Sequence, residues 1–426
     1  MNKNILHFEA HLESTYWFTN HVKKELFAYI SLKGGQAPEK QERVPLNISL
    51  VVDRSGSMSG DKLNYVKKAV NFVIDNLKAE DVLSIVQYDT EVDVVAKSAK
   101  VTDKKALHQK VKQIEARSMT NLSGGMMEGY AQTKSTQKEG YVNRVLLLSD
   151  GLANAGITDP PQLQNIAQKK FREERIALST FGVGADFNEV LMTNLSEYGG
   201  ANYYFIDMPD KIPQIFAQEL DGLLSVVAQN TSLQFGFPST YLKCTKVYGY
   251  PADIGHDQVS INLNDVFAEE EKAVLIKFEL TRPLDEPLTM QATLQYDDVV
   301  EKLERITDQV ALQITPTADE SRYKSGMNVT VQEQTVLYTA NDLFEQAMRA
   351  ADQRDFEKAK QIIGQAKATM DAYFKLMPPN EELKKQYEDI VNYGKQLEYM
   401  KEMSNNDYLV AQKMSRSASY KARKKK

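Results

Sequence analysis

Between residues 46 and 226 the chain alternates short apolar runs with amphipathic stretches, and no other feature restricts the possible folds as strongly. The apolar runs are LNISLVVD, VLSIVQYD, NRVLLLSD, IALSTFGVG and ANYYFI. Runs of this kind are typical of parallel strands that helices cover on both faces. The stretches between them repeat apolar residues every three or four positions, as amphipathic helices do. We therefore predict a doubly wound α/β domain with a mostly parallel sheet over residues 46–226.

The segments on either side of this domain have a different pattern. Two strand-like segments lie within residues 1–45, and alternating runs separated by turn signals follow over residues 227–326. The later runs are typical of an antiparallel β-sandwich. Because two strands alone do not make a stable domain, we expect the strands of residues 1–45 to pair with the later ones. The α/β domain would then be inserted into a split β-sandwich.

Residues 327–403 have helical periodicity and predict a C-terminal helical hairpin region. The segment ADQRDFEKAKQIIGQA resembles half of a tetratricopeptide repeat, but one copy is visible where a solenoid needs about three. Residues 404–426 are basic and poor in apolar residues, which predicts a disordered tail. Such a tail offers a weak electrostatic contact to an acidic partner or an anionic lipid surface.

Polar side chains follow the predicted strands at one edge of the sheet. Asp53, Ser55 and Ser57 lie in the turn after the first apolar run, Thr120 lies in the segment RSMTNLSGG, and Asp150 ends the segment LLLSD. Ligands of open parallel sheets bind at the carboxyl ends of the strands, so we expect these side chains to meet there. Asp and Ser are also common helix N-caps, so the first turn alone would not indicate a metal site. Three segments that offer hydroxyl and carboxylate oxygens predict Mg²⁺ or Mn²⁺ rather than zinc or copper.

In these residues the chain resembles the von Willebrand factor A family over residues 46–226. The family's metal-ion-dependent adhesion site consists of Asp-x-Ser-x-Ser after the first strand, a distant Thr, and an Asp-Gly after the fourth strand. This chain has DRSGS starting at Asp53, then Thr120, then Asp150 followed by glycine, in that order. The resemblance implies that the hydroxyls bind the metal directly and that the aspartates act mostly through water. It also implies one coordination position that stays open for a partner's carboxylate.

The order of the flanking elements is similar to that of bacterial relatives of inter-alpha-trypsin inhibitor heavy chains. This second resemblance rests on the order of elements and not on a motif. It therefore implies the β-structure beside the α/β domain but identifies no partner.

Composition and the remaining motifs narrow the function. A net charge of −6 gives no general reason to expect nucleic acid as a partner. A single cysteine, an N-terminus without signal-peptide order and the lack of an apolar run long enough to span a membrane predict a cytoplasmic protein. The sequence holds neither a Gly-x-Ser-x-Gly elbow nor a Walker A loop. We expect a non-enzymatic, Mg²⁺-dependent binding module or scaffold that captures a Glu or Asp of a partner protein through its metal site.

Two other functions stay open at this point. In the first of them, the chain is an accessory subunit of an ATPase or modification complex, and the ATPase is a separate chain. It is a metal-dependent hydrolase in the other, since a metal near serine hydroxyls can assist phosphoryl transfer. The motif offers only two carboxylates, without a general base or a phosphate-binding lysine, and so favours the binding module.

Overall fold

A computed structural model of the chain describes residues 5–20, 24–36, 44–150, 153–184, 187–206, 208, 211–299 and 304–425. The chain folds into two compact units. The first combines Met1–Gly35, Thr231–Asp297 and Arg305–Lys426, and the second combines Gln36–Asn230 and Asp298–Glu304. The second unit is thus inserted into the chain of the first.

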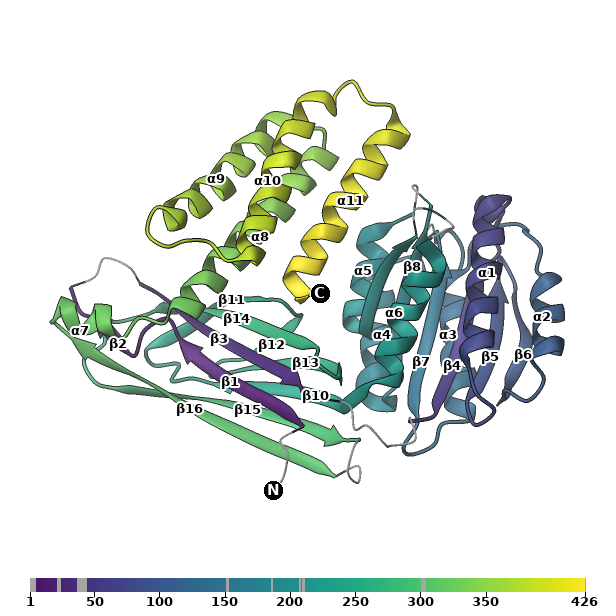
Figure 1. Ribbon diagram of the computed structural model, residues 1–426, viewed down its shortest axis with the longest axis horizontal. Helices are drawn as coiled ribbons and strands as arrows, with labels where there is room; N and C mark the ends of the chain where they lie inside the picture. The colour runs from purple at the N-terminus through teal and green to yellow at the C-terminus, as the bar shows by residue number, and fades with distance from the viewer. Residues whose placement is uncertain are drawn as a thin grey trace. The chain divides into compact units, whose positions relative to one another are not determined.

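The inserted unit contains a six-stranded sheet in the order β6-β5-β4-β7-β8-β9 (Figure 1). Strand β4 pairs in parallel with β5 and β7, and parallel pairing continues from β7 to β8 and from β8 to β9. This confirms the doubly wound, mostly parallel sheet. The sequence prediction missed β6, which lies antiparallel to β5 at the sheet edge and has one buried residue. The strands are β4 Leu46–Asp53, β5 Val82–Tyr88, β6 Val92–Lys100, β7 Val142–Ser149, β8 Ala177–Val183 and β9 Gly200–Ile206.

Helices cover both faces of this sheet (Figure 1). Helix α1 contacts α2 and α6, whereas α3 contacts α4, and α4 contacts α5. The buried residues of α1 recur every three or four positions, so one face of the helix packs inward as its sequence predicts. The helices are α1 Asp61–Asn76, α2 Lys104–Lys112, α3 Leu122–Ser135, α4 Pro160–Glu174, α5 Glu189–Tyr198 and α6 Ile212–Leu224.

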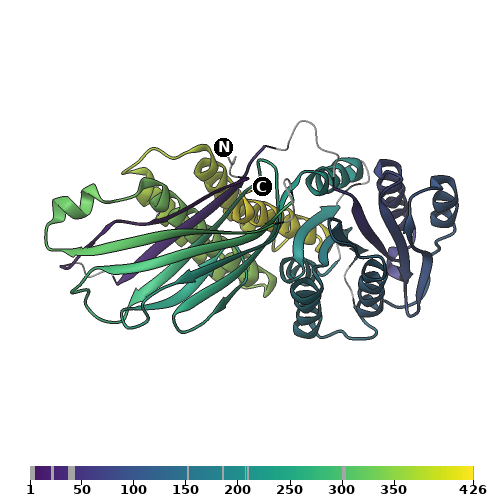
Figure 2. The same cartoon turned by 90° about the horizontal axis from the view of Figure 1, so that it is seen from below.

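The first unit is built on two further sheets, ordered β1-β3-β14-β11 and β12-β13-β10-β15-β16-β2. Strand β3 pairs antiparallel with β1 on one side and with β14 on the other, which confirms the split β-sandwich (Figure 2). Strand β2 pairs in parallel with β16 at the edge of the second sheet. The strands are β1 Leu6–Leu12, β2 Tyr16–Phe18, β3 Glu25–Gly34, β10 Val226–Gly236, β11 Leu242–Tyr248, β12 Ala252–Ile254, β13 Gln258–Phe267, β14 Glu271–Leu280, β15 Leu288–Asp298 and β16 Arg305–Thr317.

A helical region follows the sandwich in the same unit. Tyr338 of α8 packs with Phe27 and Tyr29 of β3, and its hydroxyl donates a hydrogen bond of 3.1 Å to the carbonyl of Ala273 in β14. Helix α8 therefore covers the four-stranded sheet. The helices are α7 Glu320–Ser325, α8 Val329–Asp352, α9 Phe356–Phe374, α10 Glu381–Tyr399 and α11 Asn405–Lys424.

Helix α11 corrects the prediction of a disordered tail over residues 404–426. The helix contacts α8 and α10, and these contacts stabilise a helix that its composition alone does not favour. Its last residue and the residue that follows it make contacts within the chain. The Lys424 ammonium lies 3.5 Å from the centre of the Tyr250 ring, and the Lys425 ammonium lies 2.6 Å from the Glu382 carboxylate. Contact of this segment with an acidic partner or an anionic lipid surface stays a prediction.

Candidate metal site

Two adjacent strands bring the predicted carboxylates to one edge of the sheet. Asp53 is the last residue of β4, and Asp150 directly follows the last residue of β7. The strand order reverses between β4 and β7, so this edge is the switch point at which open α/β sheets bind ligands. The glycine that follows Asp150 in the motif lies outside the described residues.

Asp53 is buried and fully hydrogen-bonded. Its Oδ1 accepts a hydrogen bond of 2.9 Å from the backbone N–H of Ser55, and its Oδ2 accepts bonds from the hydroxyls of Ser149 at 2.6 Å and Tyr88 at 3.3 Å. Burial raises the pKa of Asp53 to about 6, the Ser149 hydrogen bond opposes the rise, and the charge of Asp150 adds to it. The two buried carboxylates of Asp53 and Asp150 therefore make this edge of the sheet favourable for a cation.

Asp150 is the second buried carboxylate of the site, and one of its two oxygens lies near a lysine. Its side chain is fully buried, and its Oδ2 lies 3.5 Å from the Lys62 ammonium of α1. Its Oδ1 accepts no hydrogen bond from any residue that the structure describes. A buried carboxylate oxygen without a partner is costly, so its presence calls for an ion or a water.

The turn after β4 supplies two hydroxyls. Ser55 directly precedes the short 3₁₀-helix η1, Gly56–Met58, and Ser57 lies within it; their Oγ atoms lie 3.0 Å apart. Ser55 is buried, whereas Ser57 is exposed. Gly60, which precedes α1, has a φ of 78°, a conformation that favours glycine. The turn thus places one hydroxyl inside the site and one at its surface.

Thr120 lies in a loop that is tied down on two sides. The backbone N–H of Gly56 donates a hydrogen bond of 2.9 Å to the carbonyl of Ser118, which joins this loop to the turn after β4. On the other side, the Thr120 N–H donates to Asn154 Oδ1 at 2.7 Å, and the Thr120 carbonyl accepts from the N–H groups of Asn154 and Ala155. Thr120 is buried directly before the start of α3.

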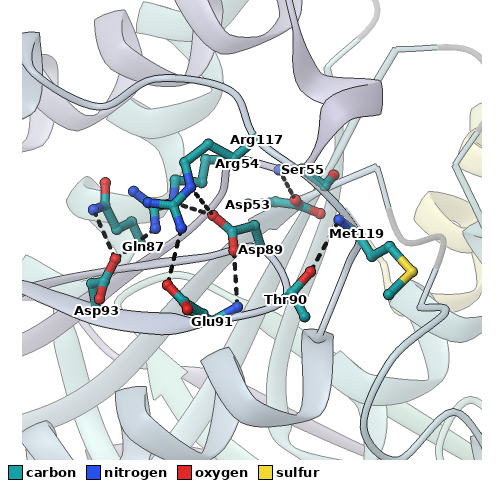
Figure 3. Close-up of polar contacts among 10 residues, drawn as sticks. All are labelled: Asp53, Arg54, Ser55, Gln87, Asp89, Thr90, Glu91, Asp93, Arg117 and Met119. Carbon is teal, nitrogen blue, oxygen red and sulfur yellow. Dashed lines mark hydrogen bonds and ion pairs between the residues drawn. The ribbon is translucent and has the colours of Figure 1, made fainter.

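An ionic network that the sequence analysis did not identify holds the same loops (Figure 3). The buried Arg54 pairs with the buried Asp89, with Nε 2.8 Å from Oδ2, and also with Asp93. Arg117 pairs with the same oxygen of Asp89 at 3.3 Å and with Glu91 at 2.9 Å. The only signal in the sequence is an arginine inside the otherwise small and polar motif DRSGS.

Backbone hydrogen bonds run beside this network. The Arg117 N–H donates to the Arg54 carbonyl at 2.7 Å, and the Asn121 N–H donates to the Asp89 carbonyl at 2.7 Å. The loop of Thr120 is therefore fastened both to the turn after β4 and to the end of β5. This arrangement pre-positions the hydroxyl segment relative to Asp53.

The donors at this edge suit a hard cation. The described residues contain no cluster of three or more His, Cys, Asp or Glu, so a metal here would depend on hydroxyls as well as carboxylates. Two carboxylates and three hydroxyls are oxygen donors of the kind that Mg²⁺ and Mn²⁺ accept. The Asp150 Oδ1, which accepts no hydrogen bond from the described residues, is consistent with this assignment.

Among the described residues, no helix combines the length and the hydropathy that a membrane span requires.

Comparison with known proteins identifies the class of the inserted domain. Residues 47–218 match the model of the von Willebrand factor type A domain family. The chain therefore contains a von Willebrand factor type A domain, which agrees with the sheet order and with the position of the candidate site at its switch point.

Two relatives are similar to this chain over part of its length. The uncharacterized protein YfbK of Escherichia coli (strain K12) is 28% identical over 249 residues, which cover 57% of this chain and 43% of YfbK. Inter-alpha-trypsin inhibitor heavy chain H3 of Rattus norvegicus is 27% identical over 230 residues, which cover 50% of this chain and 25% of the heavy chain. The chain thus matches less than half the length of each of these two relatives.

A solved structure shares the overall fold. The von Willebrand factor type A protein from Catenulispora acidiphila superposes with a TM-score of 0.70 over 91% of each chain, at 14% sequence identity. At this identity the likeness concerns the fold alone.

Proposed function

We propose that the inserted domain is a protein-binding module that holds Mg²⁺ or Mn²⁺ and, through it, captures a Glu or Asp side chain of a partner protein. Asp53, Ser55, Ser57, Thr120 and Asp150 would hold the metal. The observation that carries the proposal is the buried Oδ1 of Asp150, which accepts no hydrogen bond from any described residue. Asp150 directly follows β7, the strand that pairs with β4, and β4 ends at the buried Asp53.

The charges and exposure of these residues support capture from outside. The two carboxylates balance the charge of a divalent ion, while the three hydroxyls add oxygen ligands without further charge. A bound Mg²⁺ would supply an electrophilic coordination position that an external carboxylate oxygen can fill in place of a water. Ser57 is exposed, so the site opens to solvent on the side from which a partner would approach.

The remainder of the chain would act as a scaffold and not as catalytic machinery. The motif contains no general base, and the composition with a single cysteine suits a reducing compartment such as the cytoplasm. In this proposal the sandwich and helical unit carries the binding module and provides surface for further contacts.

Calorimetric titration of Mg²⁺ into the metal-free full-length protein tests the proposal. We expect saturable binding to the wild type, none to Asp53→Ala, and weaker binding to Thr120→Ala, which loses one neutral ligand. Asp75→Ala is the matched control, because it removes an exposed carboxylate from α1 of the same unit. Circular dichroism checks that each variant is folded. Equal binding of Mg²⁺ to the wild type and to folded Asp53→Ala would refute the proposal.

A further inference from the structure

Three exposed apolar side chains lie around the loop that carries Thr120. Met119 is 50% exposed, Met127 is 42% exposed and Ile157 is 37% exposed. We call these three residues the apolar patch. In Figure 3 the side chain of Met119 points away from the ionic network of Arg54 and its partners.

Hydrogen bonds join the segments that carry these residues. Met119 directly precedes Thr120, whose carbonyl accepts a hydrogen bond of 3.2 Å from the N–H of Ala155. Two residues further on, the N–H of Ile157 donates a bond of 2.9 Å to the Ser123 hydroxyl at the start of α3. Met127 follows Ser123 by four positions in α3 and so projects from the same face of the helix.

Charged residues beside the patch do not form a surface that attracts an acidic partner. Arg54 and Arg117 are paired with Asp89, Glu91 and Asp93, so the carboxylates of this network outnumber its guanidinium groups. Glu91 and Asp93 are also the more exposed members, at 69% and 48% of the side chain, beside Arg117 at 49%. A segment with several acidic residues would therefore meet repulsion here, whereas one carboxylate at the metal site would not.

We infer that the partner segment carries an apolar side chain next to the acidic residue that reaches the metal site, and that this side chain packs on the apolar patch. The inference rests on the proposed function. Contiguous exposed apolar patches rimmed by polar residues mark interaction surfaces. Methionine side chains are flexible and polarisable, so they accommodate apolar groups of different shape. The patch thus selects acidic residues with apolar neighbours over purely acidic segments.

Selection of random linear peptides displayed on phage tests this inference with the full-length protein. The protein is immobilised, and selections run in parallel in Mg²⁺ and in EDTA. We expect enrichment in Mg²⁺ alone of peptides in which Glu or Asp adjoins an apolar residue. The consensus peptide is then synthesised, and its affinity is measured for the wild type and for the double variant Met119→Ser/Ile157→Ser.

The double variant should bind the consensus peptide roughly tenfold more weakly, the factor that corresponds to ~1.4 kcal/mol. Met414→Ser is the matched control, because Met414 is 56% exposed on α11 in the other unit. It should leave the affinity for the peptide unchanged. Titration of Mg²⁺ into the double variant should give the wild-type affinity, which shows that its metal site is intact.

The outcomes separate the two proposals. Mg²⁺-dependent acidic peptides without apolar neighbours, or equal affinity of the wild type and the double variant, would overturn the role of the patch and leave the proposed function standing. A selection that yields no Mg²⁺-dependent acidic peptide would overturn both.

Discussion

Replacing Asp53 with asparagine removes one of two carboxyl groups at the buried edge of the sheet while keeping the size of the side chain. The amide oxygen can accept the hydrogen bond from the Ser55 N–H. The amide nitrogen can donate to the hydroxyls of Ser149 and Tyr88, which now bond Oδ2. The substitution therefore changes the charge of the site with little change in its packing.

The size of the effect follows from the pKa of Asp53. Burial raises this pKa from 3.8 to about 6, so between these values the native state binds more protons at Asp53 than the unfolded state does. Rising pH therefore lowers the free energy of unfolding over this range. Above pH 6 the native state carries the full free-energy cost of keeping a charged carboxylate buried. This cost is about 3 kcal/mol at pH 7.5 and about half of that at pH 5. Asparagine does not titrate and avoids it.

Differential scanning calorimetry of the full-length protein in EDTA measures the consequence. At pH 7.5 we expect the transition of the inserted unit to lie roughly 6–12 °C higher in Asp53→Asn than in the wild type, for about 3 kcal/mol in a unit of this size. The difference should shrink at pH 5. Mg²⁺ at a hundredfold excess over its dissociation constant should stabilise the wild type by about 2.7 kcal/mol and leave Asp53→Asn unchanged, which nearly closes the gap.

Three results would refute this reasoning. The first is an Asp53→Asn protein less stable than the wild type in EDTA at pH 7.5. The second is a difference in stability that does not depend on pH, because the carboxyl would then not be strained by burial. The third is equal stabilisation of both proteins by Mg²⁺, which would place the metal elsewhere.

Three further predictions concern residues around the site and in α11. A Cβ at Gly125 would lie 2.3 Å from the Tyr88 ring, so Gly125→Ala should lower the free energy of unfolding by about 1–3 kcal/mol, as measured by thermal unfolding. Gly364→Ala in α9 is the control and should not destabilise the protein, because a Cβ there meets nothing within 4 Å. Arg54→Met leaves the buried Asp89 with Arg117 and should lower the free energy of unfolding by about 3 kcal/mol, as measured by urea denaturation. Lys33→Met breaks an exposed pair with Glu269 and should lower it by less than about 1 kcal/mol. Removing residues 421–426 deletes the contacts of Lys424 and Lys425 and should therefore lower the melting temperature of the sandwich and helical unit, as measured by calorimetry. An unchanged transition would show that these contacts do not stabilise the unit.

Much of the fold could be read from the sequence because its patterns are local. The apolar runs that form β4, β5, β7 and β8 are buried on both faces, and such runs are recognisable without knowing their neighbours. Parallel strands in a doubly wound sheet align their carboxyl ends. Residues 53 and 150, nearly a hundred positions apart, could therefore be expected at one edge before any contact was known.

The tertiary structure decided the features that depend on partners far apart in the sequence. Helix α11 is poor in apolar residues, and its stability comes from packing on α8 and α10 and from pairs such as Lys425 with Glu382. The network of Arg54, Asp89 and Arg117 likewise joins three segments, and no spacing in the sequence marks it.

The same distinction applies within the candidate site. The sequence by itself determined which oxygen donors the chain can offer, because the residue types and their order follow the motif. It did not determine that Asp150 Oδ1 is buried without a hydrogen-bond partner among the described residues, or that burial raises the pKa of Asp53. Both follow from how β4, β7 and α3 exclude water from this edge, and solvent exclusion is a property of the packed structure and not of any local pattern.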